Sequence, residues 1–286
     1  MTIEVIEFIQ SFRNGFLDFF FNAISFVGEE YIYIAILGVV YYGINKRFGE
    51  LLAFSLFLTA AINTVIKGFV GALRPFEKYP DRVVNLRSET AGGHSFPSGH
   101  TQQFTTFYYT GAIYLNKQYL FIVAGIFSIL MAVSRMYLGV HFLEDVSVAF
   151  VLGILVALFV TWIYNKYKDT PVLHKIYIGI VIGLFPFLFF IQNKDFYTSY
   201  GLMIGFVGAM IFEQKLVNFD MEVSLVKKVI RVVVGILLML IVQLGVKAIF
   251  IGIFGEDINF LDLIRYGLIA FIGLGLYPLF FKKLQF

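Results

Sequence analysis

The sequence predicts an all-α, polytopic integral membrane protein. Of its 286 residues, 59% are hydrophobic and only 14% are charged, whereas in soluble domains about a quarter of the residues are charged. Apolar runs of about 20 residues, each long enough to cross a bilayer as a helix, recur along the chain. The mean hydropathy of +0.83 agrees with this reading. We therefore predict a bundle of about nine transmembrane helices, preceded by an N-terminal helix at the membrane interface.

Composition also excludes several classes of function. The chain has no cysteine, so a disulfide framework, a thiolate zinc site and a thiol nucleophile are all impossible. The net charge is only +3, and no basic cluster interleaved with aromatic residues is present. A nucleic-acid partner is therefore not expected.

The N-terminal segment, residues 1–28, differs from the rest. Polar residues interrupt a stretch rich in phenylalanine and isoleucine, which favours an amphipathic helix lying at the membrane interface over residues 2–27. The alternative is a tenth, poorly hydrophobic span. No basic region precedes an apolar stretch, so a cleaved signal peptide is not predicted. The interrupting residues are Glu4, Glu7, Arg13, Asp18 and Asn22.

Nine later stretches are predicted to cross the membrane. They lie at about 29–44, 49–69, 98–116, 119–138, 141–165, 174–192, 197–214, 229–254 and 261–281. The first five form a predicted core over residues 29–168, and the last four form an extension over residues 169–286. The polar junction Asp169-Thr170-Pro171 separates the two. In the extension, Gly179-xxx-Gly183 and Gly201-xxx-Gly205 would allow helices to approach closely.

Loop charge predicts the orientation, because cytoplasmic loops are enriched in lysine and arginine. If nine spans alternate, most basic loop residues fall on one side, which places the N-terminus outside and the C-terminus inside. The loop at 70–97 is basic although it lies on the opposite, outer side, and binding of an anion would explain this. We expect a bacterial plasma membrane protein with an extracytoplasmic site. The basic residues on the inner side are Lys46, Arg47, Lys117, Lys166, Lys168, Lys175, Lys215, Lys227, Lys228, Lys282 and Lys283.

Lys67 and Arg74 form the first of three polar islands in the apolar core. They are seven residues apart, which is two helical turns, so we predict that both lie on one face of a helix. Pro75 disfavours the helical region for the residue before it and would end the helix there. Two cations would then project from the end of a span. The alternative is that they extend to lipid headgroups without forming a site.

Pro97-Ser98-Gly99-His100 forms the second island, at the start of the third predicted span. Proline and serine are typical of a helix start. The free backbone N–H groups of a helix N-terminus favour a phosphate oxygen, and Gly99 would let the backbone approach it closely. His100 would face the anion from the first turn. The alternative is a capped helix with an interfacial histidine.

Ser134-Arg135, His141 and Asp145 form the third island. His141 and Asp145 are four residues apart and share a helix face. A carboxylate bonded to one imidazole nitrogen fixes the tautomer and leaves the other nitrogen free, as a histidine nucleophile requires. A purely structural His–Asp pair is the alternative. Glu144 should point about 100° away from Asp145 on the helix, so the orienting role is predicted for Asp145 alone.

Together these islands resemble the three-part signature of the type 2 phosphatidic acid phosphatase superfamily, in its membrane lipid phosphatase branch. The resemblance covers about residues 20–165, and none was found for residues 172–286. It implies that His141 attacks phosphorus to form a phosphohistidine and that Asp145 orients His141. It also implies that His100 protonates the leaving oxygen and then activates water.

The same resemblance implies that the phosphate oxygens are held by Lys67, Arg74, Ser98, Gly99 and Arg135. Three cations can stabilise the charge that Mg²⁺ stabilises in other phosphoryl-transfer enzymes. The islands hold no cluster of carboxylates that would suit a divalent ion. We therefore expect neither a metal nor another cofactor. The two remaining histidines, His94 and His174, are given no role.

An amphiphilic lipid phosphate is the expected substrate, because its headgroup can reach the cations while its tail stays among the membrane lipids. Phosphatidic acid, phosphatidylglycerol phosphate and undecaprenyl diphosphate are the candidates. One alternative function is a phosphotransferase acting on a lipid or sugar acceptor. Another is a lipid-translocating or transport protein with a phosphatase core, for which Gln243 and Lys247, inside an apolar span, are candidate residues. Otherwise the last four spans simply pack or form a homodimer.

Overall fold

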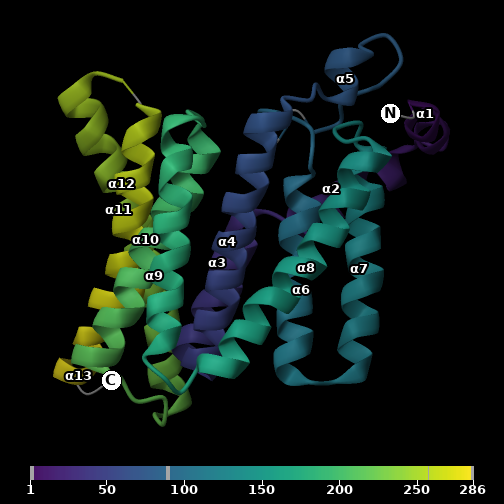
Figure 1. The fold of residues 1–286 in the computed structure, drawn as a ribbon. Helices are drawn as coiled ribbons and strands as arrows, with labels where there is room; N and C mark the ends of the chain where they lie inside the picture. Colours follow the sequence, from purple (N-terminus) through teal and green to yellow (C-terminus); the bar gives the residue numbers. More distant parts are fainter. Residues whose placement is uncertain (1–2, 88–90, 257, 285–286) are drawn as a thin grey trace. The chain divides into compact units, whose positions relative to one another are not determined.

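The computed structural model describes residues 3–87, 91–256 and 258–284, and within these ranges the chain forms helices and loops without a β-strand (Figure 1). The predicted all-α fold is confirmed. The chain divides into two compact units that do not follow the chain order. Unit 1 comprises Met1–Tyr33 and Ile62–Thr161, and unit 2 comprises Ile34–Ala61 and Trp162–Phe286. The predicted division near residue 169 stays a prediction.

Unit 1 contains all three polar islands. Helices α6 and α7 form an antiparallel hairpin, closed by a tight turn in which Asn116 adopts the left-handed conformation (φ 49°) (Figure 1). Helix α2 also packs against α7. The helices of this unit are α1 (Ile3–Gln10), α2 (Gly15–Val27), α5 (Pro75–Lys78), α6 (Gly99–Leu115) and α7 (Gln118–Tyr137), with the second part of α4 (Lys46–Val70) and most of α8 (Leu143–Tyr167).

The N-terminal segment forms two helices where the sequence predicted one over residues 2–27; residue 2 lies outside the described residues. The break falls at residues 11–14, because Asn14 caps α2: its side-chain oxygen accepts a hydrogen bond from the Leu17 N–H at 3.0 Å. Asparagine is among the preferred N-cap residues, so it starts a new helix readily. Helix α1 is anchored by Gln10, whose amide donates to the carbonyl oxygens of Val84 and Tyr137. An interfacial position for this segment stays a prediction.

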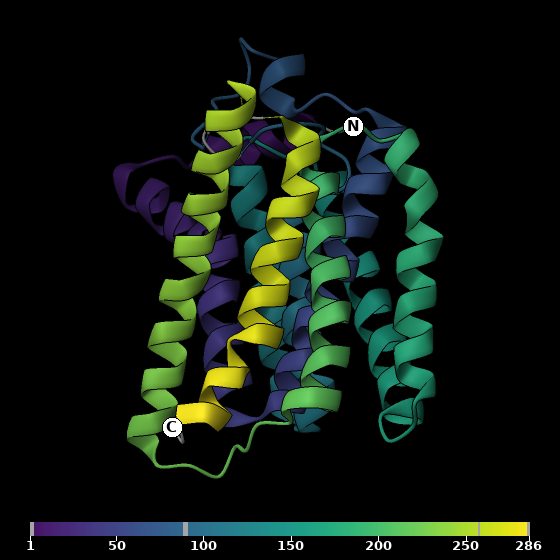
Figure 2. The ribbon, with the colours of Figure 1, turned by 90° about the vertical axis from the view of Figure 1, so that its left-hand side faces the viewer.

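Unit 2 contains the helices that follow α8. Figure 2 shows α12 lying between α10 and α11. The elements of this unit are most of α3 (Glu30–Val39), η1 (Val40–Ile44), the first part of α4, α9 (Val172–Leu184), η3 (Phe185–Phe189), α10 (Lys194–Phe212), η4 (Glu213–Val217), α11 (Leu225–Phe254), α12 (Asn259–Phe271), η5 (Ile272–Leu276) and α13 (Pro278–Leu284).

Glycine allows α10 and α12 to touch backbone to backbone. A Cβ atom at Gly201 would collide with the backbone of Leu263, and one at Gly205 would collide with the backbone of Gly267. The close approach predicted for this glycine pair is confirmed. At Gly179 and Gly183 no such approach occurs among the described residues, since a Cβ at either position would meet no described atom within 4 Å, and the prediction for this pair stays a prediction. The spacing of glycines predicts that a helix has a face of small residues, but it does not predict which helix packs against that face.

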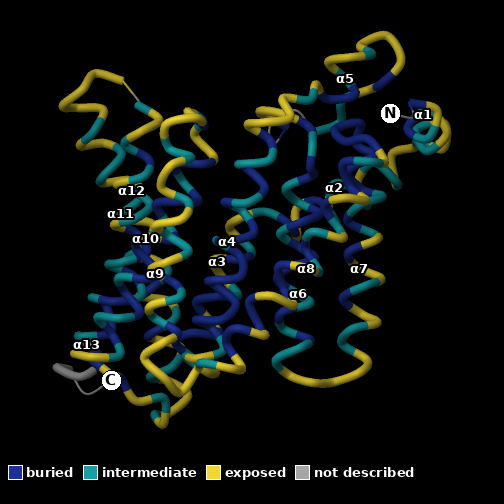
Figure 3. The backbone as a smooth tube through the Cα atoms, viewed as in Figure 1, coloured by how far each residue is buried: buried dark blue, intermediate teal, exposed yellow. Residues whose placement is uncertain are grey.

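Seven helices among the described residues are long and apolar enough to cross a membrane, or up to eight if the bent pair Gly15–Val27 and Glu30–Ile44 forms one span. Each of the nine predicted ranges nevertheless falls on a helix. The count is lower than nine for two reasons. Helix α6 has 17 residues and falls just short of the 18 required of a candidate span, and α3 qualifies only together with α2. Exposed residues recur along α7 (Figure 3). Many of the exposed residues on α7 and α11 are large and apolar, as lipid-facing helices require. The protein is therefore a multi-pass membrane protein.

Candidate functional site

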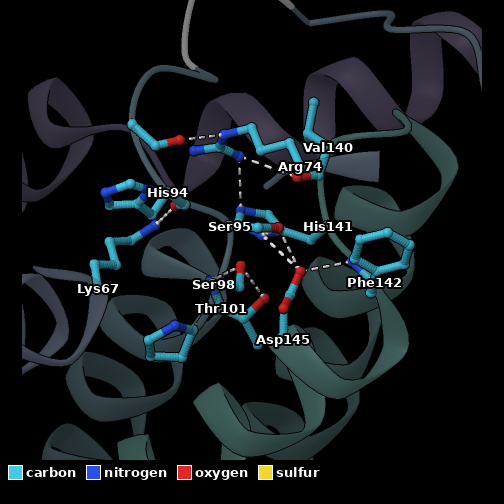
Figure 4. A network of polar contacts seen from close by, with 12 residues as sticks. Lys67, Arg74, His94, Ser95, Ser98, Thr101, Val140, His141, Phe142 and Asp145 are labelled. Atoms are coloured by element: carbon cyan, nitrogen blue, oxygen red, sulfur yellow. Dashed lines mark hydrogen bonds and ion pairs between the residues drawn. The ribbon is translucent and has the colours of Figure 1, made fainter. Parts of the chain in front are cut away.

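Three segments of unit 1 bring polar side chains together: the end of α4 with the residues that follow it, the segment leading into α6, and the α7–α8 connection. Figure 4 shows the centre of this cluster, with the His141 ring lying between Arg74 on one side and Asp145 on the other. His141 and Asp145 are both buried. A cluster of this kind, away from water, makes electrostatic interactions strong.

Asp145 holds His141 through one carboxylate oxygen. Its Oδ2 lies 3.4 Å from His141 Nδ1, and it accepts hydrogen bonds from the Ser95 hydroxyl at 2.6 Å and from the Phe142 N–H at 2.7 Å. Ser95 Oγ itself lies 3.4 Å from His141 Nδ1. Asp145 Oδ2 and Ser95 Oγ can both accept a hydrogen bond, so they favour the tautomer of His141 that carries its proton on Nδ1. The lone pair is then on Nε2.

The other edge of the ring faces a cation. His141 Nε2 lies 3.3 Å from Arg74 Nη1, which can donate to it. Burial, followed by the positive charges of Arg74, Lys67 and Arg135, holds the pKa of His141 well below its ordinary range. The residue lies in the connection between α7 and α8, outside the membrane-spanning helices. Its imidazole is therefore neutral and has an available electron pair.

Gly139 shapes the connection that carries His141. Its φ of +72° lies in the left-handed region, which is unfavourable for residues with a side chain. A Cβ atom there would also collide with the carbonyl oxygen of Val84 and approach the side chain of Gln10. The tight path of the loop after α7 therefore depends on this glycine.

Arg74 reaches the site from a position different from the one predicted. Helix α4 ends at Val70 and Gly71 follows with φ +63°, so Lys67 and Arg74 do not share one helix face. A glycine in the left-handed conformation is a common helix terminator, and it acts here before Pro75 does. Pro75 instead begins α5, with Arg74 in an extended conformation before it, as a proline at the first helical position favours.

Both cations of the first island are nonetheless held in place by backbone carbonyls. Arg74 donates to the carbonyl oxygens of Gly92, Gly93 and Val140 at 2.7, 2.9 and 3.0 Å. The Lys67 ammonium donates to the carbonyl oxygen of His94. The His94 side chain is exposed, and its backbone rather than its ring takes part. These carbonyl groups position the two charges.

The second island starts α6 as predicted. Helix α6 begins at Gly99, and Ser98 is its N-cap, with its side-chain oxygen accepting from the Thr101 N–H. Ser98 Oγ also lies 3.1 Å from the Thr101 hydroxyl. The Ser98 N–H donates to the carbonyl oxygen of Asp145 at 3.1 Å, which ties the start of α6 to the α8 segment. His100 follows in the first turn.

Arg135 is a fully buried cation with unused donors. Its Nη1 donates to the Ser25 hydroxyl of α2, whereas Nε and Nη2 have no hydrogen-bond partner within the described part of the chain. Buried donors are normally satisfied, so an orphaned pair requires an explanation. Arg135 and His100 both act electrostatically on His141. An anion bound beside His141 would supply the missing acceptor.

Sequence reasoning missed four residues that support this arrangement: Ser25, Glu29, Arg87 and Ser95. Glu29 Oε1 lies 3.5 Å from His100 Nε2 and accepts from Arg87 Nη2 at 2.8 Å. All four make contacts with residues distant in the chain, which local sequence patterns do not reveal. One sequence signal was present, because Glu29 is a charged residue between two apolar helices. The assignment of the orienting role to Asp145 rather than Glu144 stays a prediction. His174 lies in unit 2, where it contacts Gln214.

Comparison with known proteins places the chain in a family. Residues 49–169 match the model of the PAP2 superfamily, and residues 197–286 match that of the PAP2 superfamily phosphatase transmembrane extension. The second match covers most of the segment for which the sequence analysis found no resemblance.

Relatives and a solved structure agree with the family models. A phosphatidylglycerophosphatase B from Bacillus subtilis is 32% identical over 145 residues, which are 47% of this chain and 68% of the relative. An undecaprenyl-diphosphatase from Sulfolobus acidocaldarius is 29% identical over 159 residues, covering 53% of this chain and 73% of the relative. The crystal structure of a transmembrane PAP2-type phosphatidylglycerolphosphate phosphatase from Bacillus subtilis aligns with a TM-score of 0.50 and 27% identity, over 58% of this chain and 86% of that one. The chain therefore belongs to the PAP2 superfamily, and to its branch of membrane lipid phosphatases.

Proposed function

We propose that this protein is a metal-independent phosphatase that hydrolyses a lipid phosphate or an isoprenoid diphosphate through a phosphohistidine on His141. The observation that carries the proposal is the two-sided environment of that ring. Asp145 and Ser95 engage Nδ1, while Nε2 faces the guanidinium of Arg74. This is the arrangement that a neutral imidazole nucleophile needs beside an anionic substrate.

In the first half of the reaction, His141 Nε2 attacks phosphorus in line and a P–N bond forms. The bond between phosphorus and the leaving oxygen breaks, and its electron pair stays on that oxygen. His100 gives the oxygen a proton, so the alcohol or the prenyl phosphate departs neutralised. Asp145 stabilises the positive charge that develops on His141, as the carboxylate does in other histidine-based catalytic groups.

In the second half, His100 takes a proton from water as the water oxygen attacks the phosphohistidine. The P–N bond breaks, its electrons return to His141 Nε2, and inorganic phosphate leaves. Throughout, Lys67, Arg74 and Arg135 hold the phosphate oxygens, with the Ser98 hydroxyl and the Gly99 amide. Positioning and charge stabilisation provide most of the catalysis of phosphoryl transfer, so fixed cations are well suited to it.

The substrate class is inferred from the membrane context and from the relatives. One relative is a phosphatidylglycerophosphatase and another an undecaprenyl-diphosphatase, so both act on phosphate groups attached to lipids. A multi-pass protein can receive such a substrate laterally, with the lipid chain remaining in the bilayer. The distribution of lysine and arginine among the loops supports an extracytoplasmic site, under the rule that basic loops face the cytoplasm.

Phosphate release from a panel of lipid phosphates and diphosphates tests the proposal. Purified protein in EDTA should release inorganic phosphate from at least one of phosphatidic acid, phosphatidylglycerol phosphate and undecaprenyl diphosphate. His141→Ala should reduce kcat by about 10³-fold or more, as deletion of other catalytic nucleophiles does.

Three results would contradict parts of this proposal. Near-normal turnover by His141→Ala would refute the nucleophile, and loss of activity in EDTA with recovery in Mg²⁺ would refute metal independence. Labelled phosphate found on a lipid or sugar acceptor, rather than free in solution, would identify a phosphotransferase instead.

A further inference from the structure

His100 has a carboxylate partner that the three polar islands do not contain. Glu29, in the short connection between α2 and α3, places Oε1 3.5 Å from His100 Nε2. Both side chains are largely buried, with 14% of Glu29 and 17% of His100 exposed. The two histidines of the site are therefore arranged alike, because each has a carboxylate beside one ring nitrogen.

The Glu29 carboxylate is itself held by an arginine. Arg87 Nη2 donates to the same oxygen, Oε1, at 2.8 Å, and Arg87 Nη1 donates to the side chain of Asn22 at 3.1 Å. Asn22 lies on α2, so the arginine joins this helix to the carboxylate. Fixing the carboxylate in this way lowers the cost of orienting the imidazole, because the group is already immobile before substrate binds.

Gly28 brings the histidine ring against the same connection. A Cβ atom at Gly28 would lie 3.2 Å from Cδ2 of His100 and 2.7 Å from Cε of Met131. The Cδ2–Nε2 edge of His100 therefore faces residues 28 and 29, and the opposite edge carries Nδ1. When Glu29 engages Nε2, Nδ1 is the nitrogen that can reach the leaving oxygen.

The charges around His100 make the carboxylate functionally important. Burial opposes a positive charge on the imidazole most strongly, Arg135 from α7 and Arg87 from the segment after α5 oppose it as well, and Glu29 is the anion that favours it. A general acid must carry its proton before it can give the proton away. Without Glu29, the guanidinium groups of Arg135 and Arg87 would act on His100, and the negative charge beside Nε2 would be lost.

We propose that Glu29 is a positioning residue that favours the protonated form of His100 and orients it for transfer of its proton to the leaving oxygen. Glu29 accepts from Nε2–H, and the nitrogen on the opposite edge gives its proton to the leaving oxygen and regains one from water in the second half-reaction. This inference rests on the proposed function, since it assigns a support to the residue that acts there as the acid. A structural role alone, in which Glu29 only binds Arg87, is the competing explanation.

Leaving-group dependence distinguishes these roles. An alkyl phosphate ester needs a protonated leaving oxygen, whereas p-nitrophenolate is stable enough to depart without a proton. Glu29→Gln should lower kcat/KM for short-chain phosphatidic acid by about 10- to 100-fold, part of the 10²–10⁴-fold that a general acid contributes. It should lower kcat/KM for p-nitrophenyl phosphate by less than about threefold, because kcat/KM reports departure of the leaving group and not the later hydrolysis of the phosphohistidine, which both substrates share. The retained activity on p-nitrophenyl phosphate also shows that the variant is folded.

Glu7→Gln is the matched control. Glu7 also pairs with an arginine, Arg82, at 2.7 Å, but the pair is exposed and does not contact a histidine. The same substitution there should leave both rates unchanged. His100→Ala serves as the reference, because loss of the acid itself should show the same preference for p-nitrophenyl phosphate in a stronger form.

Equal losses on the two substrates in Glu29→Gln, or no loss on either, would overturn the inference. Its failure remains distinct from failure of the proposed function. If His100→Ala discriminates between the leaving groups and Glu29→Gln does not, only the role of Glu29 is wrong. If the wild-type protein releases no phosphate, or if His100→Ala also lacks discrimination, the proposed function itself needs revision.

Discussion

The two units of this protein use buried charge in different ways. In unit 1, Arg74 donates to three backbone carbonyls, and Arg135 has one hydroxyl partner and two nitrogens, Nε and Nη2, without a described partner. In unit 2, two buried or nearly buried cations contact carboxylates, and a third, Arg231, donates to the backbone carbonyl of Asp220. Lys46 lies 3.0 Å from Glu213, and Arg265 pairs with Asp262.

This contrast distinguishes a buried cation that can bind a ligand, such as Arg135, from buried cations that form ion pairs within the protein, such as Lys46 and Arg265. A buried guanidinium with donors that no described group accepts, such as that of Arg135, is costly, and a bound anion repays that cost. A buried ion pair, once formed, instead makes the loss of either partner destabilising. In unit 2 even Gln243, a candidate for a transport role, donates to the hydroxyl of Tyr266 at 3.1 Å. Within the described residues, that contact joins α11 to α12.

Among the substitutions that compare the two units, the largest effect on activity is expected at Arg135. Arg135→Met should lower kcat/KM for the best lipid phosphate by about 10²-fold or more, comparable to removing one oxyanion-stabilising donor. Thermal unfolding in detergent should stay unchanged or rise, because the substitution removes a buried charge with unpartnered donors. Arg82→Met, at an exposed arginine of the same unit, is the control and should change neither quantity. Loss of stability in Arg135→Met with activity retained would show that this charge is structural.

The pH dependence provides a smaller test of the same unit. Burial and neighbouring cations lower the pKa of His141, so its imidazole stays neutral as pH falls through the range where a free histidine would be protonated. The acid limb of kcat/KM, after correction for ionisation of the substrate phosphate, should therefore lie below the ordinary histidine value of about 6.5. A limb at or above that value would mean that the cations do not act on His141 as inferred.

The smallest effect on activity is expected in unit 2. Arg265→Met should leave kcat/KM within about threefold of wild type, because its partner is Asp262 and not a residue of the phosphate site. Its unfolding free energy in detergent should fall by about 3–5 kcal/mol, the usual result of removing one partner of a buried ion pair. If activity collapses while the fold remains stable, unit 2 has a catalytic role and the contrast between the units no longer holds.

Much of the fold could be predicted locally. Each predicted span falls on a helix because hydropathy over about 20 residues reports burial in a bilayer directly. The Ser98 cap was also predictable, since proline, serine and glycine in succession are typical of a helix start. The island from Lys67 to Arg74 shows the limit of such reasoning. Its spacing matched a helix, but Gly71 ends α4 before Arg74 is reached.

By itself, the sequence determined the membrane class of this protein, the positions of its helices and the three polar islands, because these depend on composition and short spacings. Only the tertiary structure decided what surrounds the islands. Helix α2, which was predicted to be part of an interfacial segment, carries Ser25, whose hydroxyl accepts a hydrogen bond from Arg135. The connection after α2 carries Glu29, whose carboxylate lies beside the His100 ring. Such contacts join residues about 70 to 110 positions apart in the chain. They arise from helix packing, which no local pattern of residues records.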